Sequence, residues 1–337
     1  MTISLATPAL SRLYDHGGDL ASAREAFPSA PEAWIDLSTG LNPAPYPLPS
    51  LASELWARLP EPAALCALQD AAACRYGAAP ERVVAAAGTQ AILQALPQVL
   101  RARTVAIVGP TYAEHERVWR AAGADCAIIG DLDEAGAADV VVVVNPNNPD
   151  GRLVARSRML EAAERLAARG AWLIVDEAFM DFAGESIADA AAARTIVLRS
   201  FGKAYGLAGL RLGFALAEPA TAAALRAALG PWPVSGPAIE IGVRALSDDA
   251  WLAAARRRLE ADLAWLDAAL SAAGFAPIGG TALFRLVRHP RAAERFAALC
   301  EHGVLARPFR AQPDWLRFGA PLEAQRGRVA EALRAVR

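Results

Sequence analysis

The stretch DVVVVVNPNNPDG, from Asp139 to Gly151, places five consecutive valines ahead of two Asn-Pro pairs. An uninterrupted run of β-branched residues is typical of a strand that is buried on both faces, and Asn-Pro pairs favour turns. A strand-like run also precedes a helix-like run earlier in the chain, as in RVVAAAG before TQAILQALPQVL and TVAIVGP before AEHERVWRAAG. Strands that alternate with helices predict an α/β fold with a mostly parallel sheet covered by helices on both faces.

Changes in this pattern along the chain predict three parts. The first fifty residues are predicted to be irregular, because STGLNPAPYPLPS at 38–50 contains four prolines. In the middle of the chain, SRMLEAAERLAARG predicts a helix with Ser157 as its N-cap and Gly170 just beyond its end. After about Pro231 a long helix over 250–273 and shorter strands near ALFRLV and DWLRFG predict a smaller α+β domain. We therefore expect an N-terminal arm at 1–45 that forms part of an active-site lid, a large domain at 46–230 and a small domain at 231–337.

The composition excludes several classes of protein. Hydrophobic residues make up 54% of the 337 residues, which is enough for a large core, and the net charge is −2 without a strongly basic stretch, which argues against nucleic-acid binding. The longest strongly apolar run is far shorter than the roughly 18–20 residues of a membrane helix, and the N-terminus lacks a signal-peptide pattern, so we expect a cytoplasmic protein. The four cysteines form no CxxC pair and do not cluster with the histidines, which predicts buried reduced thiols and no metal site.

Polar residues follow each predicted strand. Ligands bind at the carboxyl ends of the strands in open α/β sheets, so these residues are expected to form one site. Each of them alone is also explained as a helix cap or a turn. The set comprises Gly88, Thr89, Tyr112, Asn148, Asp176, Ser200, Lys203 and Arg211.

Together these residues match the chemistry of pyridoxal phosphate. A helix N-terminus with Thr89, Ser200 and Arg211 can hold a phosphate. A carboxylate such as Asp176 can pair with a protonated ring nitrogen, and a lysine can form a Schiff base with an aldehyde. This chemistry explains the lysine in SFGKAYGLAGLRLG, at 200–213, where small and apolar residues flank a cation.

With NPNNPDG, DEAF and SFGKAYGLAGLRLG, the chain resembles the fold-type-I, aminotransferase-like pyridoxal phosphate enzymes over nearly its whole length. The resemblance implies a seven-stranded type of sheet, pyridoxal 5'-phosphate as the cofactor and a homodimer. It also implies that Lys203 and Asp176 are catalytic, that Asn148 contacts the ring hydroxyl and that Tyr112 stacks on the ring. The phosphate is then lined by Gly88, Thr89, Ser200 and Arg211.

Within that family the chain is similar to the threonine-phosphate decarboxylases of cobalamin synthesis. HGG at 16–18 followed by DLSTGLNP, DEAFMDF at 176–182, and the arginines in VLARPF and WLRFG carry this resemblance. Two guanidinium groups suit a substrate that has both a carboxylate and a phosphate. The substrate-binding residues that the resemblance implies are His16, Gly17, Gly40, Asn148, Arg307 and Arg317.

Some positions depart from the family. Gly40 stands where the decarboxylases can have an asparagine, so that Thr39 or Asn42 would have to replace its contact. Leu59 and Phe179 stand where the aminotransferases often have tyrosines, which leaves two hydroxyl contacts without a counterpart.

We predict decarboxylation of L-threonine O-3-phosphate to 1-aminopropan-2-ol O-2-phosphate, that is, a carbon-carbon lyase with a small phosphorylated amino acid as its substrate. The alternatives are a histidinol-phosphate-type aminotransferase, which also binds two anions in turn, and a non-catalytic ligand-sensing module on the same fold. A dinucleotide-dependent dehydrogenase is excluded because no predicted strand is followed by G-x-G-x-x-G.

Overall fold

A computed structural model describes residues 8–190 and 192–336. These residues form two compact units, which we describe separately. The larger unit contains 45–148 and 152–252, and the smaller unit contains the described residues up to 44 together with 149–151 and 253–336. Residues 231–252 belong to the larger unit, so this boundary lies later in the chain than the predicted domain boundary at residue 230.

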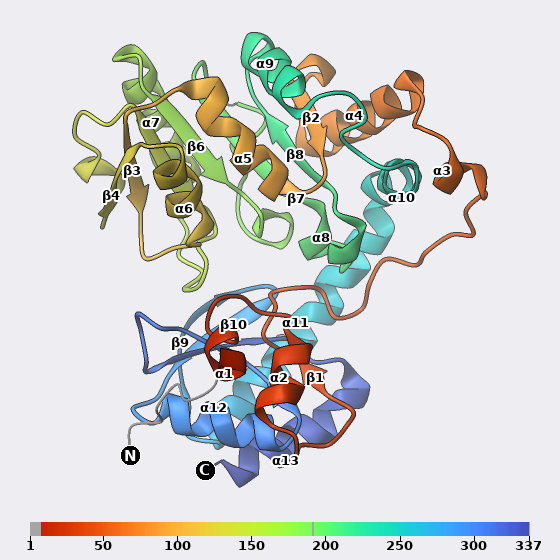
Figure 1. Cartoon of the computed structure of the whole chain (residues 1–337), viewed down its shortest axis with the longest axis vertical. Helices are drawn as coiled ribbons and strands as arrows, with labels where there is room; N and C mark the ends of the chain where they lie inside the picture. Colours follow the sequence, from red (N-terminus) through yellow and green to blue (C-terminus); the bar gives the residue numbers. More distant parts are fainter. Residues whose placement is uncertain (1–7, 191, 337) are drawn as a thin grey trace. The chain divides into compact units, whose positions relative to one another are not determined.

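The larger unit is built on a seven-stranded sheet (Figure 1). Only β8 runs antiparallel to its neighbours β2 and β7, and the remaining pairs are parallel. The predicted mostly parallel sheet in an α/β unit is therefore confirmed. The strands in their order across the sheet are β2 (Val83–Ala86), β8 (Gly213–Leu216), β7 (Thr195–Ser200), β6 (Trp172–Asp176), β5 (Val140–Val144), β3 (Thr104–Val108) and β4 (Asp125–Ile129).

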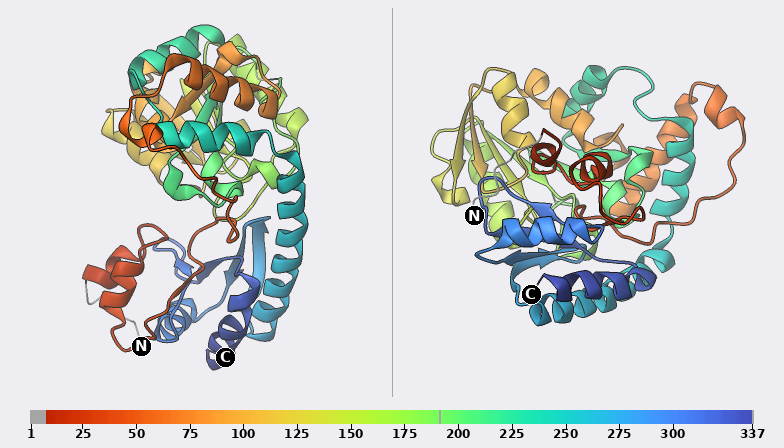
Figure 2. Two further views of the ribbon diagram at one scale, coloured as in Figure 1. Left: turned by 90° about the vertical axis from the view of Figure 1, so that its right-hand side faces the viewer. Right: turned by 60° about the horizontal axis from the view of Figure 1, so that its bottom comes forward.

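Helices cover both faces of this sheet (Figure 2). One core cluster joins α5, α6 and α9 to alternate strand residues such as Val142 and Ile174. The intervening residues Val141 and Leu173 are also fully buried, because other helices cover the opposite face. The helices of this unit are α3 (Glu54–Ala57), α4 (Pro62–Tyr76), α5 (Thr89–Leu100), α6 (Glu114–Ala121), α7 (Arg156–Ala168), α8 (Phe201–Ala204), α9 (Pro219–Leu229) and α10 (Gly236–Leu246).

The smaller unit has an antiparallel sheet in the order β12-β13-β10-β9 and a parallel pair, β1 with β11. It confirms the predicted long helix, the two predicted strands and the last helix. Its strands are β1 (Ile35–Asp36), β9 (Ala276–Thr281), β10 (Phe284–Arg288), β11 (Val304–Leu305), β12 (Arg307–Pro308) and β13 (Trp315–Gly319). Its helices are α1 (Pro8–Arg12), α2 (Leu20–Ala26), α12 (Ala292–Glu301) and α13 (Arg326–Ala335), with most of α11 (Asp249–Ala272).

Several local predictions were wrong. The first fifty residues are not all irregular, since they contain α1 and α2, and Asp19 caps α2 by accepting a bond from the Ser22 N–H at 2.9 Å. Helix α7 begins at Arg156 after an Ala155 cap, so Ser157 lies inside it. Gly170 lies just beyond this helix with a φ of 79°, as predicted.

The cysteines are not all buried, contrary to the prediction. Cys126 and Cys300 are buried, whereas Cys66 and Cys74 are exposed on α4 because Leu68, Ala72, Ala73 and Tyr76 form the buried side of that helix. Among the described helices, none combines the length and the apolar character that crossing a membrane requires.

We expect the central strands to dominate the stability of the larger unit. Ile174 in β6 is fully buried, so Ile174→Ala should lower the free energy of unfolding by about 2–5 kcal/mol. Ile128 in the edge strand β4 is 51% exposed, so Ile128→Ala should change it by only about 0.5 kcal/mol. Urea unfolding followed by far-UV circular dichroism measures both variants, and equal losses would contradict this account of the core.

Candidate active site

The carboxyl ends of β5, β6 and β7 lie side by side at one edge of the sheet. Parallel pairing aligns Val144 with Asp176, and Asp176 with Leu198. Asp176 ends β6, and Ser200 ends β7 three residues before Lys203 in α8. Residues that are distant in the sequence therefore meet where ligands bind in open α/β sheets.

Asp176 is a buried carboxylate with defined partners. Its side chain accepts a hydrogen bond from the Ala178 N–H at 3.0 Å and one from Nε2 of His115 at 2.9 Å. Asp176 is 4% exposed and His115 is fully buried. Two donors thus hold the carboxylate in one orientation at the end of β6.

His115 was not among the site residues predicted from the sequence. It lies in the first turn of α6, and its ring stands edge-on to Tyr112 with the centroids 6.1 Å apart. The sequence offered one signal, because His115 is the histidine of the GPTYAEHER segment, which directly follows the predicted strand TVAIV. Its partner Asp176 is remote in the sequence, however, and only the fold brings the two together.

Lys203 stands beside an aromatic ring. Its Nζ lies 5.3 Å from the centroid of Phe179, which follows Asp176 on the loop after β6. Phe179 is 6% exposed, and its ring has no hydroxyl to donate a hydrogen bond. The half-buried lysine thus lies close to the loop that carries Asp176.

The start of α5 forms a tight cradle with β8. Gly88 has a φ of +83°, and a Cβ there would lie 2.7 Å from Nη2 of Arg211. A Cβ on Gly213 would lie 2.5 Å from the Thr89 nitrogen. Gly213 also pairs with Ser200, so that Gly88, Thr89, Ser200 and Arg211 come together. A helix N-terminus next to a guanidinium group and a hydroxyl can bind a phosphate.

Hydrogen bonds join the loops that carry Tyr112 and Asn148. Thr111 donates to Oδ1 of Asn147 at 2.7 Å, and Nδ2 of Asn147 donates to the Pro110 carbonyl at 2.9 Å. Tyr112 and Asn148, which adjoin this contact, are therefore held on neighbouring loops. Burial, with Glu114 and Asp176 nearby, raises the pKa of Tyr112 to about 12, so its hydroxyl stays protonated at neutral pH.

The two predicted substrate arginines are neighbours in the smaller unit. Arg307 in β12 pairs directly with Arg317 in β13. Arg307 donates to the carbonyls of Leu13 and Asp15, at 3.0 and 2.7 Å, and Arg317 donates to the Ser38 carbonyl at 2.8 Å. Burial and then the charge of Arg307 lower the pKa of Arg317 to about 9. An anion beside this pair would therefore relieve its repulsion.

The same region contains the predicted N-terminal residues. A Cβ on Gly17 would lie 2.6 Å from the Ser38 carbonyl oxygen, and the Gly18 N–H donates to the Ser38 hydroxyl at 2.8 Å. Gly40 is buried two residues after Ser38, whereas His16 is exposed. His16, Gly17 and Gly40 thus belong to the smaller unit with Arg307 and Arg317, while the other predicted site residues belong to the larger unit.

The residues at the sheet edge fit pyridoxal phosphate in three respects. Gly88 and Gly213 leave space that a side chain would fill, at a helix N-terminus that suits the phosphate. The buried Asp176 supplies the carboxylate that a protonated ring nitrogen requires. Lys203 supplies an amine for the aldehyde.

Comparisons with known proteins agree with this chemistry. The family model of aminotransferase class I and II matches residues 19–335. A threonine-phosphate decarboxylase of Sinorhizobium sp is 45% identical over 94% of this chain and 97% of its own length. A histidinol-phosphate aminotransferase of Geotalea uraniireducens is 29% identical over 92% of this chain and 94% of its own length.

The fold agrees with solved structures as well. The histidinol-phosphate aminotransferase of Sinorhizobium meliloti, solved in complex with pyridoxal-5'-phosphate, matches with a TM-score of 0.81 and covers 99% of this chain and 98% of that one. Its sequence identity of 21% shows a common fold alone. The chain therefore belongs to the aminotransferase class I and II family, and its sequence groups with the threonine-phosphate decarboxylases.

Proposed function

We propose that this protein is a pyridoxal phosphate-dependent decarboxylase that converts L-threonine O-3-phosphate to 1-aminopropan-2-ol O-2-phosphate. The pairing of Arg307 with Arg317 carries this proposal, because it places two guanidinium groups on adjacent strands. The substrate has two anionic groups, a carboxylate and a phosphate, and each suits a guanidinium fork. The 45% identical relative bears the name of the same activity, and the product would serve cobalamin synthesis, as the family resemblance implies.

The larger unit would hold the cofactor. Gly88, Thr89, Ser200 and Arg211 would bind its phosphate, and Tyr112 and Asn148 would contact its ring. Asp176, whose carboxylate lies 2.9 Å from Nε2 of His115, would keep the ring nitrogen protonated. When bound, pyridoxal phosphate supplies an electron-withdrawing ring that accepts the electron pair of a broken bond at the substrate Cα.

The remaining residues determine which bond breaks. Arg307 and Arg317 would hold the two anions of the substrate. His16, Gly17 and Gly40, which belong to the same unit, would complete the substrate site. One of these arginines would hold the substrate carboxylate, which leaves as CO₂ in the proposed reaction, and the other would hold the substrate phosphate. Lys203 or a water molecule would deliver the proton that takes the place of CO₂ at Cα, which balances the reaction.

We also propose that the protein acts as a homodimer in the cytoplasm, as the sequence predicted. Trp56, Leu59 and Trp232 are more than half exposed on the larger unit, at 71, 65 and 55%. Helix α3, which contains Trp56, packs on α10, whose Gly236 lies close to Leu55, and Trp232 shortly precedes α10. Apolar side chains gathered on a surface in this way support contact with a second copy. The cytoplasmic location stays a prediction from the sequence.

A direct assay tests the proposed reaction. Purified protein loaded with pyridoxal phosphate should release CO₂ from L-threonine O-3-phosphate without any amino acceptor. Lys203→Ala, which removes the amine, should lower turnover by several orders of magnitude. Transfer of the amino group of glutamate to imidazole-acetol phosphate, without CO₂ release from threonine phosphate, would instead establish the aminotransferase alternative.

The charge of Asp176 should matter more than its shape. Asp176→Asn keeps the size of the side chain but removes its charge. We therefore expect kcat to fall by roughly 10- to 150-fold, which corresponds to a barrier higher by about 1.5–3 kcal/mol. Asp139→Asn is the matched control, because Asp139 accepts backbone bonds at the opposite end of β5, from Arg103 and Thr104 at 2.9 Å. Steady-state kinetics of both variants measure the difference. An unchanged kcat in Asp176→Asn would show that Asp176 only holds the local backbone and takes no part in the reaction.

Loss of a substrate arginine should weaken recognition of the anions. We expect Arg317→Met to lower kcat/KM for threonine phosphate by about 30-fold to several thousand-fold, since one charge-assisted partner contributes about 2–5 kcal/mol. Arg310→Met is the control, because Arg310 contacts the same N-terminal segment at Ser11 and Asp15 from a more exposed position. Equal kcat/KM values for threonine and its phosphate in the unmodified enzyme would show that no phosphate site exists.

A further inference from the structure

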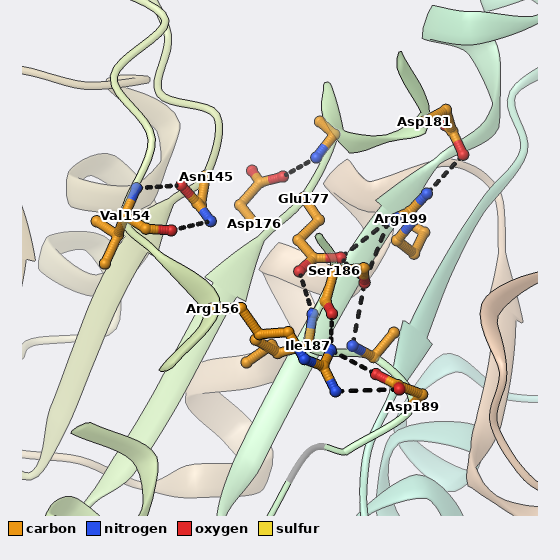
Figure 3. A network of polar contacts seen from close by, with 12 residues as sticks. Asn145, Val154, Arg156, Asp176, Glu177, Asp181, Ser186, Ile187, Asp189 and Arg199 are labelled. Carbon is orange, nitrogen blue, oxygen red and sulfur yellow. Dashed lines mark hydrogen bonds and ion pairs between the residues drawn. The ribbon is translucent and has the colours of Figure 1, made fainter. Parts of the chain in front are cut away.

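A buried ion network lies beside the site and consists of Glu177, Asp181 and Arg199 (Figure 3). One end of the Arg199 guanidinium donates to Oε2 of Glu177 at 2.9 Å, and the other end donates to Oδ1 of Asp181 at 2.5 Å. Glu177 is fully buried, and the side chains of Arg199 and Asp181 are 5% and 4% exposed. One planar fork thus joins two carboxylates in an environment with little access to water.

Glu177 also holds the loop that follows it. Its Oε1 accepts a bond from the Ile187 N–H at 3.0 Å, and its Oε2 accepts one from the Ser186 hydroxyl. The Ser186 oxygen in turn accepts a bond from the Ala188 N–H at 3.0 Å. The carboxylate therefore has three donors around it, as Figure 3 shows, and its position is closely determined.

This network adjoins two residues of the proposed cofactor site in the chain. Glu177 directly follows Asp176, and Arg199 directly precedes Ser200. The Glu177 N–H donates to the Leu198 carbonyl at 2.9 Å, and this backbone hydrogen bond joins the end of β6 to β7. Because side chains alternate along an extended chain, the carboxylates of Asp176 and Glu177 project to opposite sides.

We propose that the buried ion network is a positioning device that fixes the ends of β6 and β7 against each other, so that Asp176 and Lys203 keep their spacing around the cofactor. This inference rests on the proposed cofactor. Glu177 and Arg199 are positioning residues in this account, and neither touches the cofactor or the substrate.

The chemistry of Arg199 suits this role. Burial alone would lower the pKa of Arg199, but Asp181 and Glu177 raise it above its usual range, so the side chain stays charged. Its guanidinium carbon also lies 4.5 Å from the centroid of the Tyr76 ring. Buried ion pairs often add little net stability compared with apolar side chains, whereas removal of one partner leaves an uncompensated charge. We therefore assign the network a geometric rather than a stabilising role.

Two conservative variants and a matched control test this role in the full-length protein. Arg199→Lys keeps the charge but loses the fork, and Glu177→Gln keeps the shape but loses the charge. Asp189→Asn is the control, since Asp189 lines the same cavity of about 430 Å³ as Arg199 but pairs with Arg156 at the surface. Each protein is titrated with pyridoxal phosphate, and its thermal unfolding and the circular dichroism of the bound cofactor in the visible range are recorded.

We expect Arg199→Lys and Glu177→Gln to bind pyridoxal phosphate about tenfold or more weakly, by analogy with metal sites, where removal of a group that orients a ligand lowers affinity by about 10–100-fold. Their visible circular dichroism should also weaken at temperatures well below unfolding, while Asp189→Asn should match the unmodified protein. Lower unfolding temperatures with unchanged affinity and unchanged visible signal would overturn the inference and leave the network a purely structural one. An unmodified protein that does not bind pyridoxal phosphate would overturn the proposed function instead.

Discussion

The parallel pairing of β5, β6 and β7 is the constraint on which the site depends. It aligns Val144, Asp176 and Leu198 in one row, so that the chain leaves all three strands at the same edge of the sheet. A shift of one residue between β6 and β7 would move Asp176 by about 3.3 Å relative to Ser200 and turn its side chain to the opposite face. All five valines of β5 are buried, because helices cover both faces of a parallel sheet. This burial favours the central position of β5 in the sheet and so the parallel pairing.

The end of β6 also shows how the protein accommodates two adjacent buried carboxylates. Asp176 and Glu177 project to opposite sides of the chain, and each has its own partners. Asp176 accepts bonds from His115 and the Ala178 backbone, whereas Glu177 accepts bonds from Arg199 and the loop at 186–187. Of these two neighbouring carboxylates, Glu177 is the one paired with an arginine among the described residues. This division leaves the charge of Asp176 available to a cationic ring nitrogen.

In the smaller unit two cations, and not two carboxylates, lie next to each other. Arg307 and Arg317 lie opposite each other on β12 and β13, and both guanidinium groups donate to backbone carbonyls of the N-terminal segment. Burial and then the charge of Arg307 lower the pKa of Arg317, and a bound anion would counteract the repulsion between the two arginines. The same bonds tie residues 13–15 and Ser38 to this sheet, so the arginines also organise the segment that contains Gly17 and Gly40.

The sequence by itself determined the sheet type, the long helix of the smaller unit and the residues gathered at the strand ends, because these follow from local patterns such as the valine run and the glycines around Lys203. It did not predict α1 and α2, which are short and depend on contacts such as the Asp19 cap. Nor did it identify His115 as the partner of Asp176 or Arg199 as the partner of Glu177 and Asp181. Only the tertiary structure decided these pairings, because a buried charge takes its partner from whichever strand or helix the fold places beside it, however distant in the sequence.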